Sequence, residues 1–181
     1  MDNWNITAPI RMSSSYSIPL IESLELDRGI ALVGTVWTTQ EVKAFFQDRK
    51  NHLYCWTDNL AESDHAEGKH KWCDYRAIVG LRYGIETLKD GTVLYRTKTI
   101  DHMVVDYSGG DAKFYGYCGR VLFDLASRWT REDATGKLVC HVDDRDSQWI
   151  TMFQAAGFTT TDVVNSDSAT LLRMELGGDL C

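Results

Sequence analysis

The chain has 181 residues, with 19 basic and 26 acidic side chains and a formal net charge of -7 at pH 7. Hydrophobic residues make up 44% of it and charged residues 25%, which fits a single domain over residues 1–181 and excludes disorder over most of the chain. No apolar stretch approaches the roughly 20 residues of a membrane-spanning helix, and the acidic balance argues against general binding to the phosphate backbone of nucleic acids.

The first residues and the cysteines bear on the compartment. The chain starts without the basic segment and apolar run of an export signal. The five cysteines are odd in number and widely spread, which favours free thiols in a reducing compartment. We therefore expect a cytoplasmic protein without a membrane partner.

The first third of the chain carries few regular signals. Residues 1–29 contain both prolines and a serine run, so we predict an irregular N-terminal arm. Residues 30–37 are rich in β-forming side chains, and Thr38 followed by Glu41 in the first turn predicts the cap of a short helix. We further predict a strand at 52–57 and an exposed loop at 58–71.

The rest of the chain has a tighter pattern. The dipeptide Asp90-Gly91 is typical of a hairpin turn between two strands. Apolar residues at helical spacing mark two further segments, the second ending at Gly157. In chain order we predict strands at 75–83 and 92–106, a glycine-containing loop at 107–113, a helix from Gly119, a strand at 137–142, a helix after 143–146, and strands at 158–164 and 169–176.

A strand–helix–strand step within one sheet needs a parallel or mixed sheet with helices packed on it. This order of elements, with three stretches of sequence, resembles the GNAT superfamily of N-acetyltransferases over about residues 76–176. The stretches are 100–106 with 113–122, then 137–142 with the helix closing on Gly157-Phe158, and finally 171–176. The resemblance implies an α/β (α+β) fold with a mixed, mostly antiparallel central sheet, splayed at a parallel strand pair and carrying helices on both faces.

The resemblance also implies a site for an acyl-CoA, with acetyl-CoA as the default donor. Glycine permits close backbone approach, and amides that open into a helix converge at its positive end, where a diphosphate fits. The family pattern, Gln or Arg, two residues, Gly, one residue, then Gly or Ala, falls on Lys113, Gly116 and Cys118, so Lys and Cys depart from it. A plain strand–helix turn is the alternative. The implied cofactor-binding residues are Met103, Val104 and Val105 on the strand and Lys113, Phe114, Tyr115, Gly116, Tyr117, Cys118, Gly119 and Arg120 in the loop.

Transfer of an acyl group to an amine needs a base that takes up the amine proton. The family's usual glutamate falls nearest Thr99, which is no base. Asp101 shares a strand face with Thr99, whereas His102 points the other way, so the two cannot line one cleft unless a bulge intervenes. We predict Asp101 as the catalytic residue and His102 as the runner-up, whose ordinary pKa of about 6.5 suits proton transfer. Purely structural roles for both remain the alternative.

One position departs from the resemblance in a way that bears on activity. The family often carries a tyrosine before the closing Gly-Phe that protonates the leaving thiolate, and Phe153 stands there. Tyr107, Tyr115 or Tyr117 could compensate. Cys118 is expected to be a small loop residue and not a nucleophile. The competing hypothesis is a non-catalytic interaction or structural protein of the same fold, with Tyr115 and Tyr117 filling the cofactor groove.

The resemblance implies that the acceptor is an amine of a small molecule or of a protein, and that the protein is a homodimer. An enzyme that modifies a nucleobase with the same donor is less favoured, because the chain is acidic.

A second set of residues lies outside the resemblance. Cys55, His65, His70 and Cys73 are two thiols and two imidazoles, the ligand types of a closed zinc site. However, the first spacing is long and no close cysteine pair is present, so we regard zinc as unlikely and predict buried cysteines beside an exposed loop.

Overall fold

The computed structural model describes residues 10–12, 29–31, 38–57, 75–132 and 137–177, and the structural statements below concern these. Within them the chain forms three helices and eight strands. In order they are β1 (Ile10–Met12), β2 (Gly29–Ala31), α2 (Thr39–Gln47), β3 (His52–Thr57), β4 (Tyr75–Thr87), β5 (Val93–Asp106), α4 (Asp111–Glu132), β6 (Lys137–Asp143), α5 (Ser147–Ala155), β7 (Thr159–Asn165) and β8 (Thr170–Gly177).

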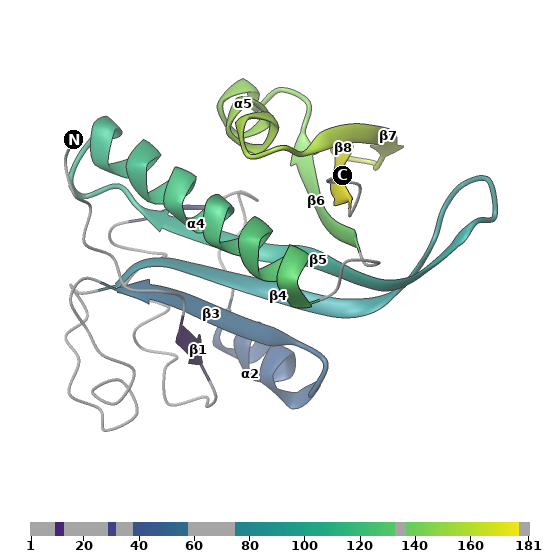
Figure 1. Ribbon diagram of the computed structural model, residues 1–181, viewed down its shortest axis with the longest axis horizontal. Coiled ribbons are helices and arrows are strands. Elements are labelled where there is room, and N and C mark those ends of the chain that lie inside the picture. The colour runs from purple at the N-terminus through teal and green to yellow at the C-terminus, as the bar shows by residue number, and fades with distance from the viewer. Residues whose placement is uncertain (1–9, 13–28, 32–37, 58–74, 133–136, 178–181) are drawn as a thin grey trace.

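All eight strands belong to one sheet, in the order β1-β3-β4-β5-β6-β8-β7, with β2 paired to β5 off this path. The neighbouring strands are antiparallel except β5 and β6, which run parallel. Helices α4 and α5 cover one face and α2 lies on the other (Figure 1). The predicted fold class, a mixed and mostly antiparallel sheet with helices on both faces, is confirmed.

Each face of the sheet has its own apolar core. The larger cluster packs α4 and α5 against the sheet and contains Ile100, Met103 and Val105 of β5. The smaller cluster packs α2 and contains Val104 of the same strand. These memberships show which side chains of β5 face which helices, and so they orient the residues between them.

The predicted helix cap, hairpin turn and helix stop, each of which depends on residues close together in the sequence, are confirmed. Thr38 and Glu41 form a capping box at the start of α2. Gly91, with φ of +86°, closes the β4–β5 hairpin. After α5, Gly157 adopts a φ of +97° and Phe158 donates to the carbonyl of Phe153, which is a Schellman motif.

Residues 10–12, within the predicted N-terminal arm, form strand β1, which pairs with β3 at the edge of the sheet. One prediction about local structure is wrong. Helix α4 begins at Asp111 and not at Gly119, so the predicted loop residues 113–118 are helical. The helix starts early because buried residues recur at helical spacing from its first turn onward. They are Phe114, Tyr117, Cys118, Val121, Leu122 and Leu125.

Candidate functional site

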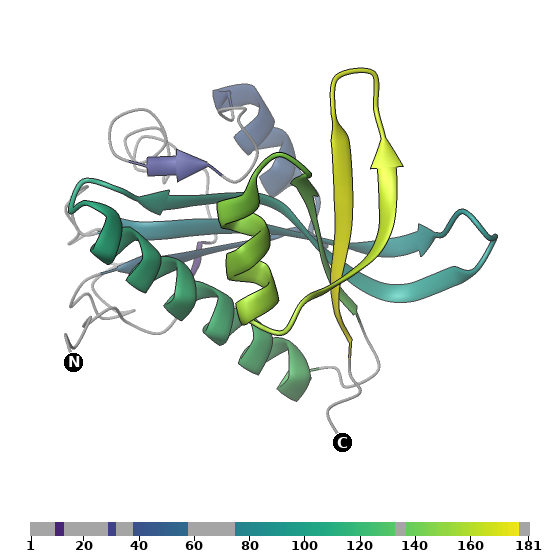
Figure 2. The same cartoon turned by 90° about the horizontal axis from the view of Figure 1, so that it is seen from above.

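The parallel pair β5 and β6 diverges almost as soon as it forms. The register joins only Thr97–Thr99 to Lys137–Val139, and beyond these pairs the two strands separate. Figure 2 shows β6 leaving the direction of β5, with α5 over the diverging strands. The predicted splay of the sheet at a parallel pair is therefore present, and its vertex lies next to residues 100–103 of β5.

The edge of β5 in this opening is partly covered by β2. Gly29, Ile30 and Ala31 pair with Asp106, Val105 and Val104 in antiparallel register. Strand β4 pairs with Val104 and Val105 on the other edge. Of the pairings in the described chain, none takes up residues 100–103 on the edge facing β6. This pairing could not be predicted from the sequence, because nothing local in residues 29–31 specifies a distant partner.

A β-bulge interrupts β5 at Asp101. The register passes from Gly80 opposite His102 to Leu81 opposite Ile100, so Asp101 is the extra residue. The bulge reverses the alternation of side chains. Ile100 lies in the cluster under α4, whereas His102 shares its face with Val104 of the α2 cluster.

The bulge brings both predicted base candidates to the α2 face. Arg82 of β4 alternates with residues of the α4 cluster and therefore also faces α2. Its guanidinium donates to the Asp101 carboxylate at 2.9 Å. His102 is 1% exposed and interacts electrostatically with Glu41 of the α2 capping box. Asp101 and His102 are thus neighbours on one surface, although simple alternation separates them.

The Asp101 carboxylate and the His102 imidazole have different surroundings. Arg82 already engages one oxygen of Asp101, and both side chains of that pair reach solvent. His102 is enclosed by the core. Of the two, His102 is therefore the side chain whose nitrogen is better shielded from bulk water.

The end of β5 is fixed to the start of α4 by a buried ion pair. Asp106 is 1% exposed, receives a hydrogen bond from Arg76 at 2.6 Å and accepts another from the amide of Ser108. The Arg76 guanidinium also lies 5.7 Å from the centre of the Tyr117 ring in α4. These contacts hold the turn 107–110 in place between strand and helix.

The first turn of α4 is the part of this region suited to an anion. Phe114 is the first residue to donate within the helix, to Gly110, so the amides of 111–113 precede it. These amides stand at the positive end of a helix of 22 residues. The stem of Lys113 folds back against Gly109, since a Cβ on that glycine would lie 2.3 Å from the lysine Cδ.

Asp111 and Tyr107 also belong to this turn. The Tyr107 hydroxyl donates to the Asp111 carboxylate, and this hydrogen bond raises the pKa of Tyr107. The Tyr107 hydroxyl is therefore already committed to Asp111.

This geometry changes the predicted way in which 113–120 would bind a diphosphate. From Tyr115 to Arg120 the backbone amides are inside the helix and donate to preceding carbonyls, so they cannot grip a phosphate. Phe114, Tyr117 and Cys118 are buried, which leaves Tyr115, Gly119 and Arg120 at the surface. Burial raises the pKa of the Cys118 thiol to about 12, which agrees with a structural role for it.

A groove of about 410 Å³ runs between α4 and α5 beside these surface residues. Tyr115 and Phe123 rise on the α4 side and Met152 on the α5 side, and all three are apolar or aromatic. Gly119 forms part of its floor, and a Cβ there would meet no atom within 4 Å. Sequence reasoning did not find this groove, since it depends on how two separate helices pack.

The predicted lack of a proton donor at Phe153 is consistent with its position. Phe153 is fully buried, and its ring packs edge-on against Phe158 at 5.0 Å. Tyr117 is 5% exposed in the core, and Tyr115 lines the groove between α4 and α5.

Among the residues of the zinc hypothesis, only Cys55 is described. It is fully buried in β3, and burial raises the pKa of its thiol to about 12. His65, His70 and Cys73 lie outside the described residues. Within the described chain no group of three or more His, Cys, Asp or Glu side chains is placed to hold a metal.

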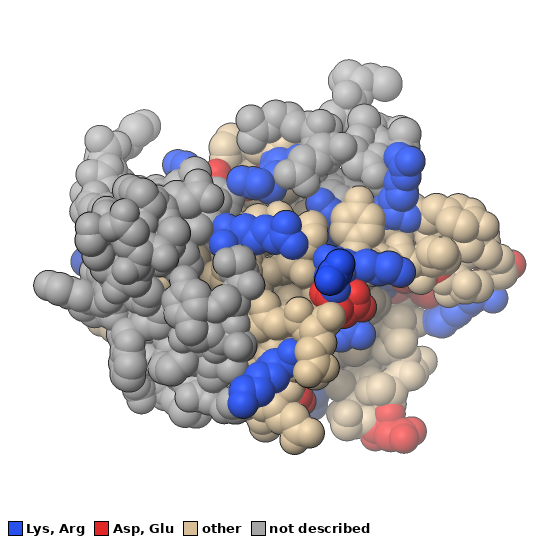
Figure 3. Space-filling view, turned by 90° about the horizontal axis from the view of Figure 1, so that it is seen from below, with Lys and Arg blue, Asp and Glu red and all other residues tan. Residues whose placement is uncertain are grey.

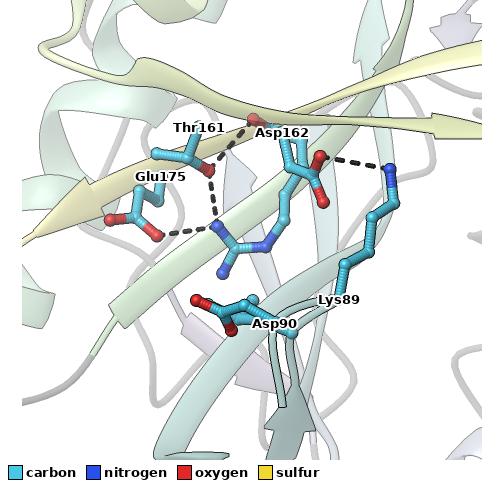
Figure 4. Close-up of a pocket in the computed structure, with 7 residues that line it drawn as sticks. Lys89, Asp90, Thr161, Asp162 and Glu175 are labelled. Carbon is cyan, nitrogen blue, oxygen red and sulfur yellow. Dashed lines mark hydrogen bonds and ion pairs between the residues drawn. The ribbon is translucent and has the colours of Figure 1, made fainter. Parts of the chain in front are cut away.

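A further pocket, of about 310 Å³, lies between the β4–β5 hairpin and strands β7 and β8 (Figure 4). The buried Arg173 guanidinium forms its base, with both oxygens of Glu86 at 2.7 Å, Thr161 at 2.6 Å and Glu175 at 2.7 Å. Lys89 pairs with Asp162 across its mouth. These four hydrogen bonds hold the guanidinium and join the long hairpin to the end of the sheet, so we interpret the arrangement as structural.

The described residues of α2 and the turn after it carry more basic than acidic side chains. Figure 3, which views this side, shows Lys and Arg spread over the described surface and Asp and Glu in smaller areas. The exposed basic residues are Lys43, Arg49 and Lys50, against the acidic Glu41 and Asp48.

No protein-family model and no curated protein sequence matches the chain. Solved structures do. A spermidine N-acetyltransferase from Vibrio cholerae in complex with CoA and spermine superposes with a TM-score of 0.63 at 11% identity, covering 96% of each chain. A putative GnaT-family acetyltransferase from Bordetella pertussis gives a TM-score of 0.61 at 12% identity, covering 90% of this chain and 91% of that one.

A third similar structure is the ribosomal-protein-S18-alanine N-acetyltransferase from Escherichia coli, with a TM-score of 0.58 at 12% identity and 96% of each chain covered. The chain therefore has the fold of GNAT acetyltransferases over nearly its whole length. At this level of identity the similarity concerns the fold. In the described part of the chain, no helix is both long and apolar enough to cross a bilayer.

Proposed function

We propose that the protein is an acyl-CoA-dependent N-acyltransferase, with acetyl-CoA as the default donor and an amine of a small molecule or a protein as the acceptor. The observation that carries this proposal is the coincidence of three features along one strand. β5 separates from β6 after Thr97–Thr99, bulges at Asp101, and leads through a glycine-containing turn into the start of α4. A donor can thus lie between an anion site and a pair of titratable side chains.

The donor is supported by the shape and chemistry of the described surface. The first-turn amides of α4 and the nearby Lys113 suit a diphosphate. The apolar groove between α4 and α5 suits the adenine or the methylated part of the pantetheine. We place the polarising amide on the edge of β5 at 100–103, which no described strand pairs with on the side facing β6.

The proposed reaction is direct attack. The amine nitrogen forms a bond to the thioester carbonyl carbon, the carbon–sulfur bond breaks, and the sulfur leaves with that electron pair and takes a proton from solvent. His102 accepts the proton that the amine loses, directly or through water. Asp101, engaged by Arg82, contributes negative charge beside the positively charged amine and does not take the proton. No covalent enzyme intermediate is required.

The acceptor enters from the α2 side in this proposal, because Asp101 and His102 both face that side. The exposed Lys43, Arg49 and Lys50 favour an acceptor that carries acidic groups besides its amine, such as an amino acid or a peptide. The spermidine enzyme among the similar structures is named for a polycation. A panel that compares acidic peptides, neutral amines and polyamines would separate these classes.

Donor binding is tested by calorimetry with CoA and acetyl-CoA on the full chain. The Gly119→Trp variant should lose binding, because an indole on the groove floor fills the space between α4 and α5. The matched control is Gly119→Ala, whose Cβ meets open space and should bind as the wild type does. Absence of binding to the wild type at millimolar ligand would contradict the proposal.

The base is tested by steady-state kinetics with the best acceptor of the panel. His102→Gln should lower kcat/KM by about 10²–10⁴. Asp101→Asn should lower it far less and mainly raise KM for the amine. A larger loss in Asp101→Asn than in His102→Gln would favour Asp101 as the base.

The rival proposal, a non-catalytic protein of this fold, is favoured by one observation. Strand β2 covers part of the edge that a donor would use. A protein that binds no CoA in calorimetry, with its thermal unfolding unchanged by the ligand, would fit that rival. Homodimer formation and a cytoplasmic location stay predictions.

A further inference from the structure

Strand β2 lies in the opening between the diverging strands. Each strand has two edges, and β4 takes one edge of β5 along residues 93–105. β6 takes the other edge at Thr97–Thr99, and β2 takes that same edge at Val104–Asp106. Among the pairings of the described chain, these two leave residues 100–103 between them.

An acyl-CoA that reaches the bulge needs the edge that β2 covers. The pantetheine arm is an extended chain with two secondary amides, and such a chain pairs with an open strand edge as an added strand does. Its diphosphate end belongs at the first turn of α4, which follows Asp106, and its thioester end belongs near Asp101. The arm between these points runs past Val104–Asp106.

We propose that β2 is an internal competitor of the donor, exchanged for the pantetheine arm when the protein binds acyl-CoA. The fraction of molecules with β2 paired then sets the apparent affinity for the donor. This inference rests on the proposed function and concerns the regulation of the same site.

The two partners in this pairing are held very differently. In β2, Ile30 is 38% exposed, and none of Gly29, Ile30 and Ala31 belongs to either apolar cluster of the described chain. In β5, Val104 and Val105 are fully buried and Asp106 is fixed by Arg76. Release of β2 therefore uncovers an edge without dismantling the core, whereas β5 keeps its place.

The first test removes the pairing. Ile30→Pro lacks the backbone donor and restricts Gly29, so it disfavours an antiparallel pair at this site. If β2 is paired in about nine molecules of ten, its release should tighten the calorimetric Kd for CoA about tenfold. Ile30→Val, which keeps the donor and the β-branched side chain, is the matched control and should bind as the wild type does.

The second test fixes the pairing. Ala31 and Val104 are register partners, so their side chains share a face, and the double variant Ala31→Cys, Val104→Cys can form a cross-strand disulfide. The oxidised protein should bind CoA at least tenfold more weakly than the same sample after reduction. Recovery on reduction shows that the double variant is folded.

Two outcomes overturn the inference in distinguishable ways. If wild type, Ile30→Pro and the oxidised pair bind CoA with one affinity, β2 does not compete, while the proposed donor site stands. If none of them binds CoA, the proposed function itself fails. Amide hydrogen exchange adds a direct readout: with CoA bound, residues 29–31 should lose protection while Val104–Asp106 keep it, and retained protection at 29–31 would contradict the exchange.

Discussion

The two faces of the central sheet differ in the side chains that they carry. Under α4 and α5 the face is apolar and rich in aromatic rings, which touch one another in an unbroken series. The series is Phe114, Trp149, Phe153 and Phe158. The opposite face has the smaller apolar cluster beside α2 and also carries charged and titratable groups, with Arg82, Asp101 and His102 near the bulge and Arg173 with its carboxylates near the hairpin.

The difference shows how one strand can serve both faces. β5 contributes Ile100, Met103 and Val105 to the aromatic core, so it is anchored from one side. The bulge at Asp101 then places two consecutive polar residues on the other side. Packing on the α4 face thus holds in place the strand that carries Asp101 and His102. We therefore expect substitutions in that packing to change mainly stability, and substitutions of the two polar residues to change mainly activity.

The largest expected effect breaks the aromatic face. Phe153→Ala removes a fully buried ring and leaves a cavity that Phe158 and Trp149 only partly fill. We expect the free energy of unfolding to fall by about 3–5 kcal/mol, measured by urea denaturation. Val42→Ala on the α2 face removes less apolar volume and should cost about 2 kcal/mol. Equal losses would contradict the inequality of the two cores.

The next effect concerns the charged face. Arg173 is 3% exposed and holds Glu86, Glu175 and Thr161. Arg173→Leu therefore removes the cation that pairs with Glu86, whereas Glu175 keeps its ion pair with Lys137. We expect a loss of about 3 kcal/mol in the free energy of unfolding. Arg173→Lys keeps the charge but not the planar fork and should recover only part of it. A Leu variant as stable as the wild type would show that this network adds nothing.

A smaller effect is expected for two glycines, one just after α5 and one inside α4. Gly157 has a φ of +97°, and a Cβ there would lie 3.2 Å from Leu176 Cδ1. Gly157→Ala should therefore destabilise the protein by about 1–2 kcal/mol in the same urea experiment. Gly119→Ala, inside α4 and facing open space, should instead stabilise it by about 0.5–1 kcal/mol. The test is whether the two substitutions change the free energy of unfolding in opposite directions.

These glycines also show which local features can be predicted from the sequence and which cannot. Gly157-Phe158 is a correctly predicted stop because the motif is closed by its own neighbours, through the Phe158 amide and the contact with Phe153. Gly116 and Gly119 misled the reading of α4, since they suggested a loop inside a continuous helix. The apolar spacing of Phe114, Tyr117 and Val121 was the signal that would have placed the start correctly.

The candidate site also has a part that the sequence predicts and a part that it does not. The alternation argument identified Asp101 and His102 and stated that only a bulge could bring them together, and a bulge is present at that position. The pairing of β2 with β5 could not be read from the sequence. It is a contact between residues about 75 positions apart, and the three residues of β2 carry no pattern that selects a partner.

The smallest expected effect is a pH dependence on the charged face. His141 of β6 lies beside Arg173 in the register, and burial lowers its pKa below the ordinary 6.5, with Glu86 opposing this and Arg173 adding to it. The unfolded chain therefore takes up this proton first, so the contribution of His141 to stability is complete above about pH 6.5 and is lost as the pH falls toward its folded-state value. Unfolding in urea should show wild-type stability declining between about pH 7 and pH 5, and His141→Gln should decline less. The carboxylates titrate mainly below that window. If the stabilities of the two proteins decline in parallel, other groups cause the acid sensitivity and His141 does not contribute to it.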